Sequence, residues 1–205
     1  MENITHIFAL LFLMLGPFKI IGPFMQLTAS ADHKLTRKIA FRAIIYSTAA
    51  LLIAGLLGQS ILAKYRIPIH ILALSGGIIL FLVAVLNVIR QFNMPEPHDK
   101  TNQAPPPDLG VAINPLAFPT IVTPYGIAAV IVFLALSPDL KTKLTVGAVV
   151  MAIMTLNLVF MIFSKSLIRI LAFILPLLAA ILGVLQVALG LQIMYRSINE
   201  LLKSQ

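Results

Sequence analysis

Six long apolar stretches follow one another along this chain, and the charged residues gather in the short segments between them. A helix needs roughly 20 mostly apolar residues to cross the hydrocarbon core of a bilayer. The stretches that meet this length lie at about 4–29, 39–62, 68–89, 111–137, 144–164 and 169–195. The pattern therefore predicts an all-α membrane protein with six transmembrane helices.

A proline-rich segment divides the chain into two halves of three spans each. Residues 91–110 contain five prolines together with acidic and basic residues, a composition typical of a flexible or extended loop. We expect a first three-helix repeat at 1–90, a linker loop at 91–110 and a second repeat at 111–205. Because three is an odd number, the second half must enter the membrane in the opposite orientation, which predicts inverted repeats.

Prolines interrupt the first and the fourth apolar stretch at corresponding places. The first stretch contains Pro17 and Pro23, and the fourth contains Pro115, Pro119 and Pro124. Proline removes a backbone donor and clashes with the preceding helical turn. Backbone groups freed at membrane depth are tolerated only where protein or water satisfies them. We therefore expect both helices to be broken near the midplane, where transporters built from repeats bind their substrates.

Each break has the composition of a helix start. Thr123 suits the N-cap and Pro124 the first helical position, and Gly22-Pro23 repeats this arrangement with a weaker cap. The free N–H groups and the positive dipole end of such a half-helix attract a carboxylate, while free carbonyl groups upstream attract an ammonium group or a cation. A zwitterionic amino acid fits both polarities. The alternative is that the prolines only kink the helices and shape their packing.

Lys19 lies in the middle of the first apolar stretch, beside the break. A lysine at the centre of a membrane helix costs roughly 2.5–3.5 kcal/mol on insertion scales. All seven Asp and Glu residues lie outside the six stretches, so its ammonium group must meet carbonyl groups, water or a negative ligand group, or else lose its proton. We expect Lys19 to hold the carboxylate of the substrate. The alternative is that it reaches water through a hydrated cavity and has no role in binding.

Polar residues elsewhere in the spans are less specific candidates. Asn157, Gln186 and Gln192 are of the type that more often bridges helices than binds a substrate. Ser75 precedes two glycines, whose small size lets another backbone approach closely. The residues expected at the substrate site are Pro17, Lys19, Gly22, Pro23, Ser75, Asn114, Pro115, Pro119, Thr120, Thr123 and Pro124.

Composition supports the membrane assignment and excludes several other classes. The chain is 60% hydrophobic and 11% charged, with a mean hydropathy of +1.01. It has no cysteine, and its four histidines lack ligand spacing, so we expect no disulfide, no metal and no cofactor. No catalytic triad, phosphate-binding loop or pair of intramembrane carboxylates is present, so we expect no enzyme. The net charge of +8 fits membrane-flanking loops better than nucleic-acid binding.

The lysines and arginines that flank the spans indicate the orientation of the chain. One side of the membrane would carry Lys34, Arg37, Lys38, Arg42, Arg90, Lys100, Lys165 and Arg169. The other side would carry Lys64, Arg66, Lys141, Lys143, Arg196 and Lys203. This bias favours a cytoplasmic loop at 30–42 and periplasmic termini. The N-terminus carries Glu2 and no basic segment, so the first apolar stretch is expected to be retained as a span.

Two motifs resemble the MarC family of multi-pass bacterial inner-membrane proteins. Residues 75–82, Ser-Gly-Gly-Ile-Ile-Leu-Phe-Leu, are similar to the third-span signature of that family, and the prolines of the fourth stretch are similar to its fourth-span signature. The first span departs from the family pattern. It has Gly16 where the family has Asp or Asn, and Pro23 follows Pro17 by six positions instead of five.

The resemblance covers nearly the whole chain apart from the central loop, and it implies a distant relation to amino-acid exporters of the lysine-exporter (LysE) type. Some members of the family are described as small neutral amino acid transporters. The sequence thus predicts a transporter of small neutral amino acids or similar zwitterions, with membrane lipids and this substrate as its partners and no nucleic acid. It leaves the coupling ion, Na+ or H+, and the oligomeric state undecided. The alternatives are a membrane scaffold or regulatory protein and a passive channel or lipid-handling protein.

Overall fold

The structure is a computed structural model that describes residues 4–92, 107–137, 139–166 and 174–203. Within these ranges the chain is helical and contains no strand, which confirms the all-α class. The helical segments are α1 (Ile4–Leu15), α2 (Phe18–Leu27), α3 (His33–Lys64), α4 (Ile69–Phe92), η1 (Leu109–Ala112), η2 (Ile113–Ile121), α5 (Pro124–Leu136), α6 (Leu140–Ile162) and α8 (Ile174–Lys203).

Five helical stretches are long and apolar enough to cross a membrane, and a bent pair makes a sixth. The five are Ile4–Leu27, His33–Lys64, Ile69–Ile89, Leu140–Ile162 and Leu177–Lys203. The pair consists of Leu109–Ile121 and Pro124–Leu136, whose axes are bent by 64°. The described part of the chain is therefore a multi-pass membrane protein with five or six candidate spans.

Helix ends extend past the apolar stretches where polar residues cap them. α3 begins at His33 because the Asp32 side chain accepts a hydrogen bond from the Leu35 amide at 2.7 Å and so satisfies a free donor of the first turn. α8 continues to Lys203, and there Lys203 and Glu200 form an ion pair at 3.4 Å. The expected linker falls mostly on residues 93–106, which lie outside the described ranges.

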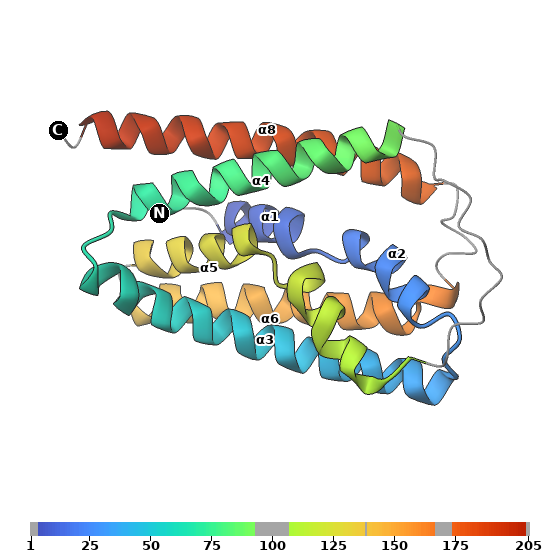
Figure 1. The fold of residues 1–205 in the computed structure, drawn as a ribbon. Coiled ribbons are helices and arrows are strands. Elements are labelled where there is room, and N and C mark those ends of the chain that lie inside the picture. The colour runs from blue at the N-terminus through green and yellow to red at the C-terminus, as the bar shows by residue number, and fades with distance from the viewer. Residues whose placement is uncertain (1–3, 93–106, 138, 167–173, 204–205) are drawn as a thin grey trace.

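The helices pack as a bundle in which the interrupted segments lie between two helix pairs (Figure 1). α4 packs along α8 on one side, and α3 packs along α6 on the other. Figure 1 also shows that α1 and α2 run in the opposite direction to η2 and α5, and that both ends of the chain lie at the same end of the bundle. This end is called the terminal end below, and the opposite one the loop end.

The α4–α8 pair is close because glycines line its crossing. A Cβ atom at Gly190 would lie 2.9 Å from the backbone of Phe81, and one at Gly77 would lie 3.2 Å from the Gly190 carbonyl oxygen. A side chain at Gly190 would push the backbone of α4 away, and one at Gly77 would be tight against α8. In a membrane, where lipid tails are as apolar as leucine, such close packing is a main source of helix association.

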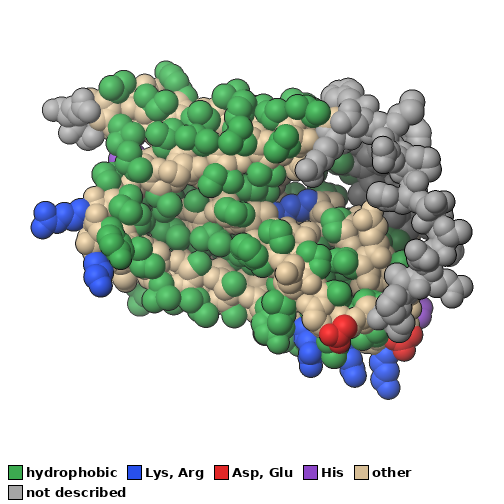
Figure 2. Space-filling view, viewed as in Figure 1, with side chains coloured by type: hydrophobic (Ala, Val, Ile, Leu, Met, Phe, Trp, Pro, Cys, Tyr) green, Lys and Arg blue, Asp and Glu red, His purple; other side chains and the backbone are tan. Residues whose placement is uncertain are grey.

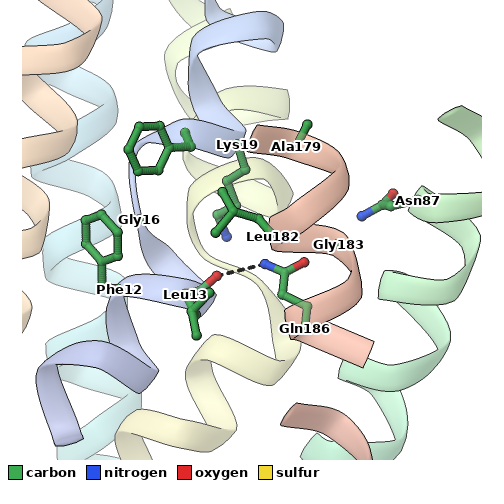
Figure 3. Close-up of a pocket in the computed structure, with 10 residues that line it drawn as sticks. Phe12, Leu13, Gly16, Lys19, Asn87, Ala179, Leu182, Gly183 and Gln186 are labelled. Atoms are coloured by element: carbon green, nitrogen blue, oxygen red, sulfur yellow. Dashed lines mark hydrogen bonds between the residues drawn. The ribbon is translucent and has the colours of Figure 1, made fainter. Parts of the chain in front are cut away.

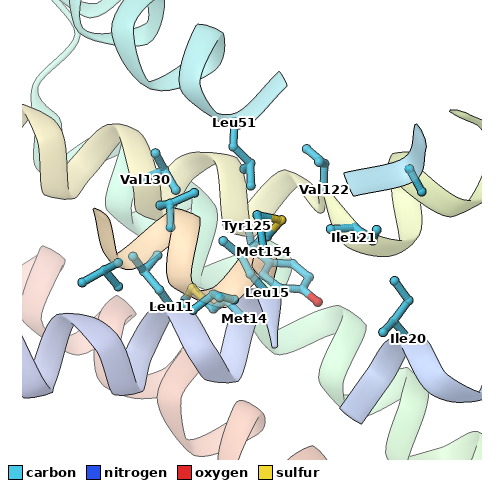
Figure 4. Packing of buried hydrophobic residues seen from close by; sticks show 14 of the residues in the cluster. Leu11, Met14, Leu15, Ile20, Leu51, Ile121, Val122, Tyr125, Val130 and Met154 are labelled. Carbon is cyan, nitrogen blue, oxygen red and sulfur yellow. The ribbon is translucent and has the colours of Figure 1, made fainter. Parts of the chain in front are cut away.

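The most buried side chains lie where the interrupted helices meet. Figure 4 shows Leu11 and Leu15 of α1 next to Tyr125 of α5 and Met154 of α6. These four side chains are at most 5% exposed. The outer faces instead carry large exposed apolar side chains, and Lys and Arg gather at the two ends of the bundle (Figure 2). This distribution is the one expected of a protein whose flanks contact lipid.

Candidate functional site

The first apolar stretch is interrupted between Leu15 and Phe18. α1 ends at Leu15, and α2 begins at Phe18 with Pro17 at its N-cap in a helical conformation (φ −73°, ψ −24°). The predicted helix start at Gly22-Pro23 is wrong, because Pro23 lies inside α2. Pro17 already supplies a φ suited to a helix start, and its missing N–H would be unpaired there in any case. The cost of Pro23 is that the Lys19 carbonyl group lacks its usual helical donor.

The second interrupted helix restarts at Pro124, as the sequence predicts. Thr123 is the N-cap of α5, and its side chain accepts a hydrogen bond from the Gly126 amide at 3.2 Å. In the preceding η2, Asn114 and Phe118 have extended backbone conformations, so this segment is not a regular helix. The free N–H groups at the start of α5 are thus partly satisfied by Thr123 itself.

The two restart points lie against each other in the middle of the bundle. A Cβ atom at Gly126 would lie 2.6 Å from the Leu15 Cδ2 atom, so the first turn of α5 is in contact with the end of α1. The Lys19 Nζ atom lies 5.5 Å from the centre of the Tyr125 ring, within the range of a cation–π interaction. Segments more than 100 positions apart in the chain thus form one local structure.

Side chains from three helices bind the last carbonyl groups of α1. A helix end leaves its final carbonyl groups without intrahelical donors. The pairs are Gln186 Nε2 to Leu13 O at 2.7 Å, Lys19 Nζ to Met14 O, and Asn157 Nδ2 to Leu15 O at 2.8 Å. Lys19 thus meets a carbonyl group, one of the partners that the sequence left open, while its contact with a substrate carboxylate stays a prediction. The expectation that Asn157 and Gln186 bridge helices is confirmed. The carbonyl groups that the sequence suggested for a ligand are engaged by the protein.

A cavity of about 300 Å³ opens beside this helix end. Figure 3 shows the residues that line it, which come from the α1–α2 junction, α4 and α8. They are Phe12, Leu13, Gly16, Phe18, Lys19, Asn87, Ala179, Leu182, Gly183 and Gln186. In Figure 2 a Lys or Arg side chain is visible inside a hollow of this face, apart from the basic residues at the two ends. The wall of the cavity is mostly apolar, with an ammonium group and two amide groups as its polar members.

A second cavity, of about 400 Å³, lies between α1, α4, α5 and α8, nearer the terminal end. Met14 and Tyr125 line it, and at its outer part lie His70, Arg196 and Glu200. In α8 its lining begins at Ile193, seven positions after Gln186, which corresponds to roughly 10 Å along a helix. Lys19, which lines the first cavity and contacts Met14 and Tyr125, therefore lies between the two cavities.

Only part of the predicted site set lies at this meeting point. Pro17 and Thr123 are buried at the two restarts, and Lys19 lines the first cavity. Ser75 is exposed on α4, and its hydroxyl group donates to Ile71 O at 2.9 Å. The remaining members line neither cavity; Gly22, Asn114, Pro119 and Pro124 are exposed, and Pro23, Pro115 and Thr120 are half-buried.

The sequence did not predict that three further residues would lie at the site, although it named Gln186 as a residue that bridges helices. Asn87 and Gln186 line the first cavity, and Tyr125 lies beside Lys19. The available signals were weak. Asn87 is a lone amide in an apolar stretch, and Tyr125 directly follows the Thr123-Pro124 pair. Neither feature distinguishes a cavity residue from one that faces another helix.

Comparisons with known proteins place the chain in a family of integral membrane proteins. A family model described as MarC family integral membrane protein matches residues 1–202. A UPF0056 membrane protein of Methanocaldococcus jannaschii is 32% identical over 139 residues, which are 68% of this chain and 67% of the relative. A second one from that organism is 28% identical over 207 residues, covering 96% and 87% of the two chains. The UPF0056 membrane protein YvbG of Bacillus subtilis is 29% identical over 129 residues, or 62% and 61%. No solved structure matches the chain.

Proposed function

Because this chain belongs to the MarC family of integral membrane proteins, we propose that it moves a small solute across the bacterial inner membrane. We propose small neutral amino acids or similar zwitterions as the solute. The observation that carries this proposal is the Lys19 ammonium group on the wall of a cavity in the middle of the bundle. Among the described residues it has a carbonyl group and an aromatic ring as partners, and no carboxylate.

The first cavity offers complementary groups to both ends of a zwitterion. A carboxylate would accept hydrogen bonds from the Lys19 ammonium group, and the positive dipole end of α2, whose first turn lines the cavity, adds to the attraction. Gln186 uses its nitrogen on Leu13, which leaves its carbonyl oxygen to accept from a substrate ammonium group. A volume of about 300 Å³ is at the lower end of ligand pockets, which run from roughly 300 to 1,000 Å³. A small amino acid suits this size.

The two cavities support a route through the protein. They lie at different depths along α4 and α8, and the contact of Lys19 with Met14 and Tyr125 separates them. We propose that the substrate passes from one cavity to the other when this contact opens. In alternating access the site stays fixed while one group of helices rocks against another.

We propose that the two halves are inverted repeats whose first helices are broken near the midplane. The packing supports this, since α1 packs on α5 while η2 packs on α2, and α1 packs on α6 while η2 packs on α3. Such reciprocal pairs are expected from a two-fold axis in the membrane plane. We also propose that the loop end lies in the cytoplasm and both termini in the periplasm, as the distribution of Lys and Arg along the sequence favours.

Transport in proteoliposomes tests the proposal directly. The purified protein is reconstituted, and uptake and efflux of a panel of labelled amino acids are measured with and without Na+ and H+ gradients. We expect saturable movement of small neutral amino acids, and none of a sugar of similar mass. Empty liposomes are the control. Absence of movement for every zwitterion would favour a scaffold or regulatory protein, and equal movement of unrelated solutes would favour a passive channel.

A further inference from the structure

The end of α1 is a negative pole inside the bundle, and the Lys19 ammonium group lies on it. The last carbonyl groups of a helix carry a partial charge equivalent to roughly half an electron. Lys19 belongs to the next helix, yet its side chain turns back across the break to donate to the Met14 carbonyl group. Where transporters have discontinuous helices, carbonyl groups at such an end are the ones that coordinate Na+.

The side-chain oxygen of Asn157 lies near these carbonyl groups and accepts no hydrogen bond from the residues that the structure describes. Asn157 is 1% exposed, and its Nδ2 atom donates to the Leu15 carbonyl group at 2.8 Å. The Oδ1 atom of the same amide is buried and has no hydrogen-bond partner among the residues that the structure describes. A buried amide oxygen without a donor is rare, since desolvating it is unfavourable. It marks a place where a cation would be stabilised.

We propose that Lys19 is a tethered cation that occupies the position of a sodium ion at the end of α1. Its ammonium group neutralises the Met14 carbonyl pole and, by charge repulsion, keeps a second cation away from the neighbouring oxygens. The wild-type protein therefore binds no Na+ at this break. Shortening the side chain frees the Met14 carbonyl group, which follows Leu13 of the cavity wall and directly precedes Leu15, the residue whose carbonyl group Asn157 binds. An ion that enters through the first cavity would then take the place of the ammonium group beside these oxygens.

One consequence concerns coupling, and it rests on the proposed function. If the protein transports amino acids, the charge that Na+ supplies at the carbonyl end of a broken helix is already present as Lys19. Substrate movement by the wild-type protein is then independent of a sodium gradient. The ion-binding part of the inference does not depend on transport and is tested separately.

The test is the melting temperature of purified protein in detergent, in chloride salts of Na+, K+ or N-methylglucamine at constant ionic strength. A ligand that binds only the folded state raises the melting temperature with concentration. We expect wild type to melt at the same temperature in all three salts. Lys19→Ala, which opens the space, should gain a saturable stabilisation by NaCl. Lys19→Met, which fills the space without a charge, should gain none.

Each outcome bears on the inference. A sodium-specific stabilisation of wild type, or a folded Lys19→Ala variant that is indifferent to Na+, would overturn it. If Lys19→Ala does not fold in potassium buffer, its folded yield in sodium buffer becomes the readout, and an equal loss in both buffers also overturns the inference. Amino-acid transport that needs Na+, together with the expected melting temperatures, would refute only the coupling consequence. Expected melting temperatures without any transport would refute only the proposed function.

Discussion

At the scale of single residues, Lys19 combines two opposing contributions to stability. A lysine at membrane depth costs roughly 2.5–3.5 kcal/mol on insertion scales. Its charged hydrogen bond to the Met14 carbonyl group contributes roughly 1.5–3 kcal/mol. The two contributions are of similar size, so the charge is close to neutral for stability. This balance supports the proposal that the main effect of Lys19 is on what enters the first cavity.

Lys19→Met is the substitution that separates binding from stability. Since the two contributions nearly cancel, we expect an unchanged or slightly raised melting temperature. Substrate affinity should fall by about 1.5–3 kcal/mol, or roughly 10- to 150-fold, because the carboxylate loses a charged donor. The measurement is the melting temperature and the substrate dissociation constant of both proteins in the same detergent. An unchanged dissociation constant would mean that Lys19 serves only to cap the end of α1.

At the scale of secondary-structure elements, N-caps stabilise the helices where they begin. Thr123 at the start of α5 is the clearest example. Its hydroxyl group accepts from the Gly126 amide, and both residues are buried. Thr123→Ala leaves that amide unpaired, and loss of such a cap costs roughly 0.5–2 kcal/mol. We expect a correspondingly lower melting temperature. Thr123→Ser keeps the hydroxyl group and should stay near wild type; an equal loss in both variants would mean that the methyl group, and not the cap, matters.

The start of α6 gives a stability that depends on pH. The Asp139 carboxylate accepts two hydrogen bonds from Thr142, one from its hydroxyl group at 2.6 Å and one from its amide at 3.2 Å. These bonds lower the pKa of the Asp139 carboxyl group below its ordinary 3.8. Because the folded-state pKa is the lower one, the ionised carboxylate stabilises the fold above pH 3.8, and this contribution disappears as the pH falls through the folded-state pKa.

Asp139→Asn removes this titration and keeps a side chain that can cap the helix. The range from about pH 6 to about pH 3 brackets the ordinary pKa of Asp. Over this range the melting temperature of wild type should fall further than that of the variant. Melting curves of both proteins over this range are the measurement. Parallel curves would show that the Asp139 carboxylate does not contribute to the acid sensitivity of the protein.

At the scale of the whole molecule, the fold places the α2–α3 turn and the α3–α4 turn at opposite ends of the bundle (Figure 1). Since the chain has no cysteine, single cysteines report the orientation without background. Ser30 and Lys64 are exposed at the two ends of α3. A membrane-impermeant thiol reagent on intact cells should label Lys64→Cys and leave Ser30→Cys unlabelled.

Permeabilised cells are the control for this labelling, because both variants should react there. The reverse pattern in intact cells would place the loop end of the bundle in the periplasm and refute the proposed orientation. Labelling of both variants in intact cells would contradict a span between them. Either result would leave the packing of the helices unchanged, since the two orientations differ only in which end faces the cytoplasm.

Local patterns were enough to predict the membrane spans of this protein, which number five or six in the part that the structure describes. A helix of sufficient apolar length must cross the bilayer whatever its neighbours are, so the apolar stretches indicated the spans. The cap at Thr123 follows from residues within one turn of each other. The start of α2 was less determined, because both Pro17 and Pro23 are compatible with a helix start. In the structure α2 begins directly after Pro17.

The contacts that define the site were decided by tertiary structure alone. Gln186 and Asn157 reach the end of α1 across 173 and 142 positions of sequence, and nothing in the local pattern says which carbonyl group each one meets. The sequence by itself determined that Lys19 has no acidic partner in the spans. Only the fold decided that its ammonium group turns back to Met14 and lies between two cavities, because the position of one helix end relative to another depends on the packing of the whole bundle.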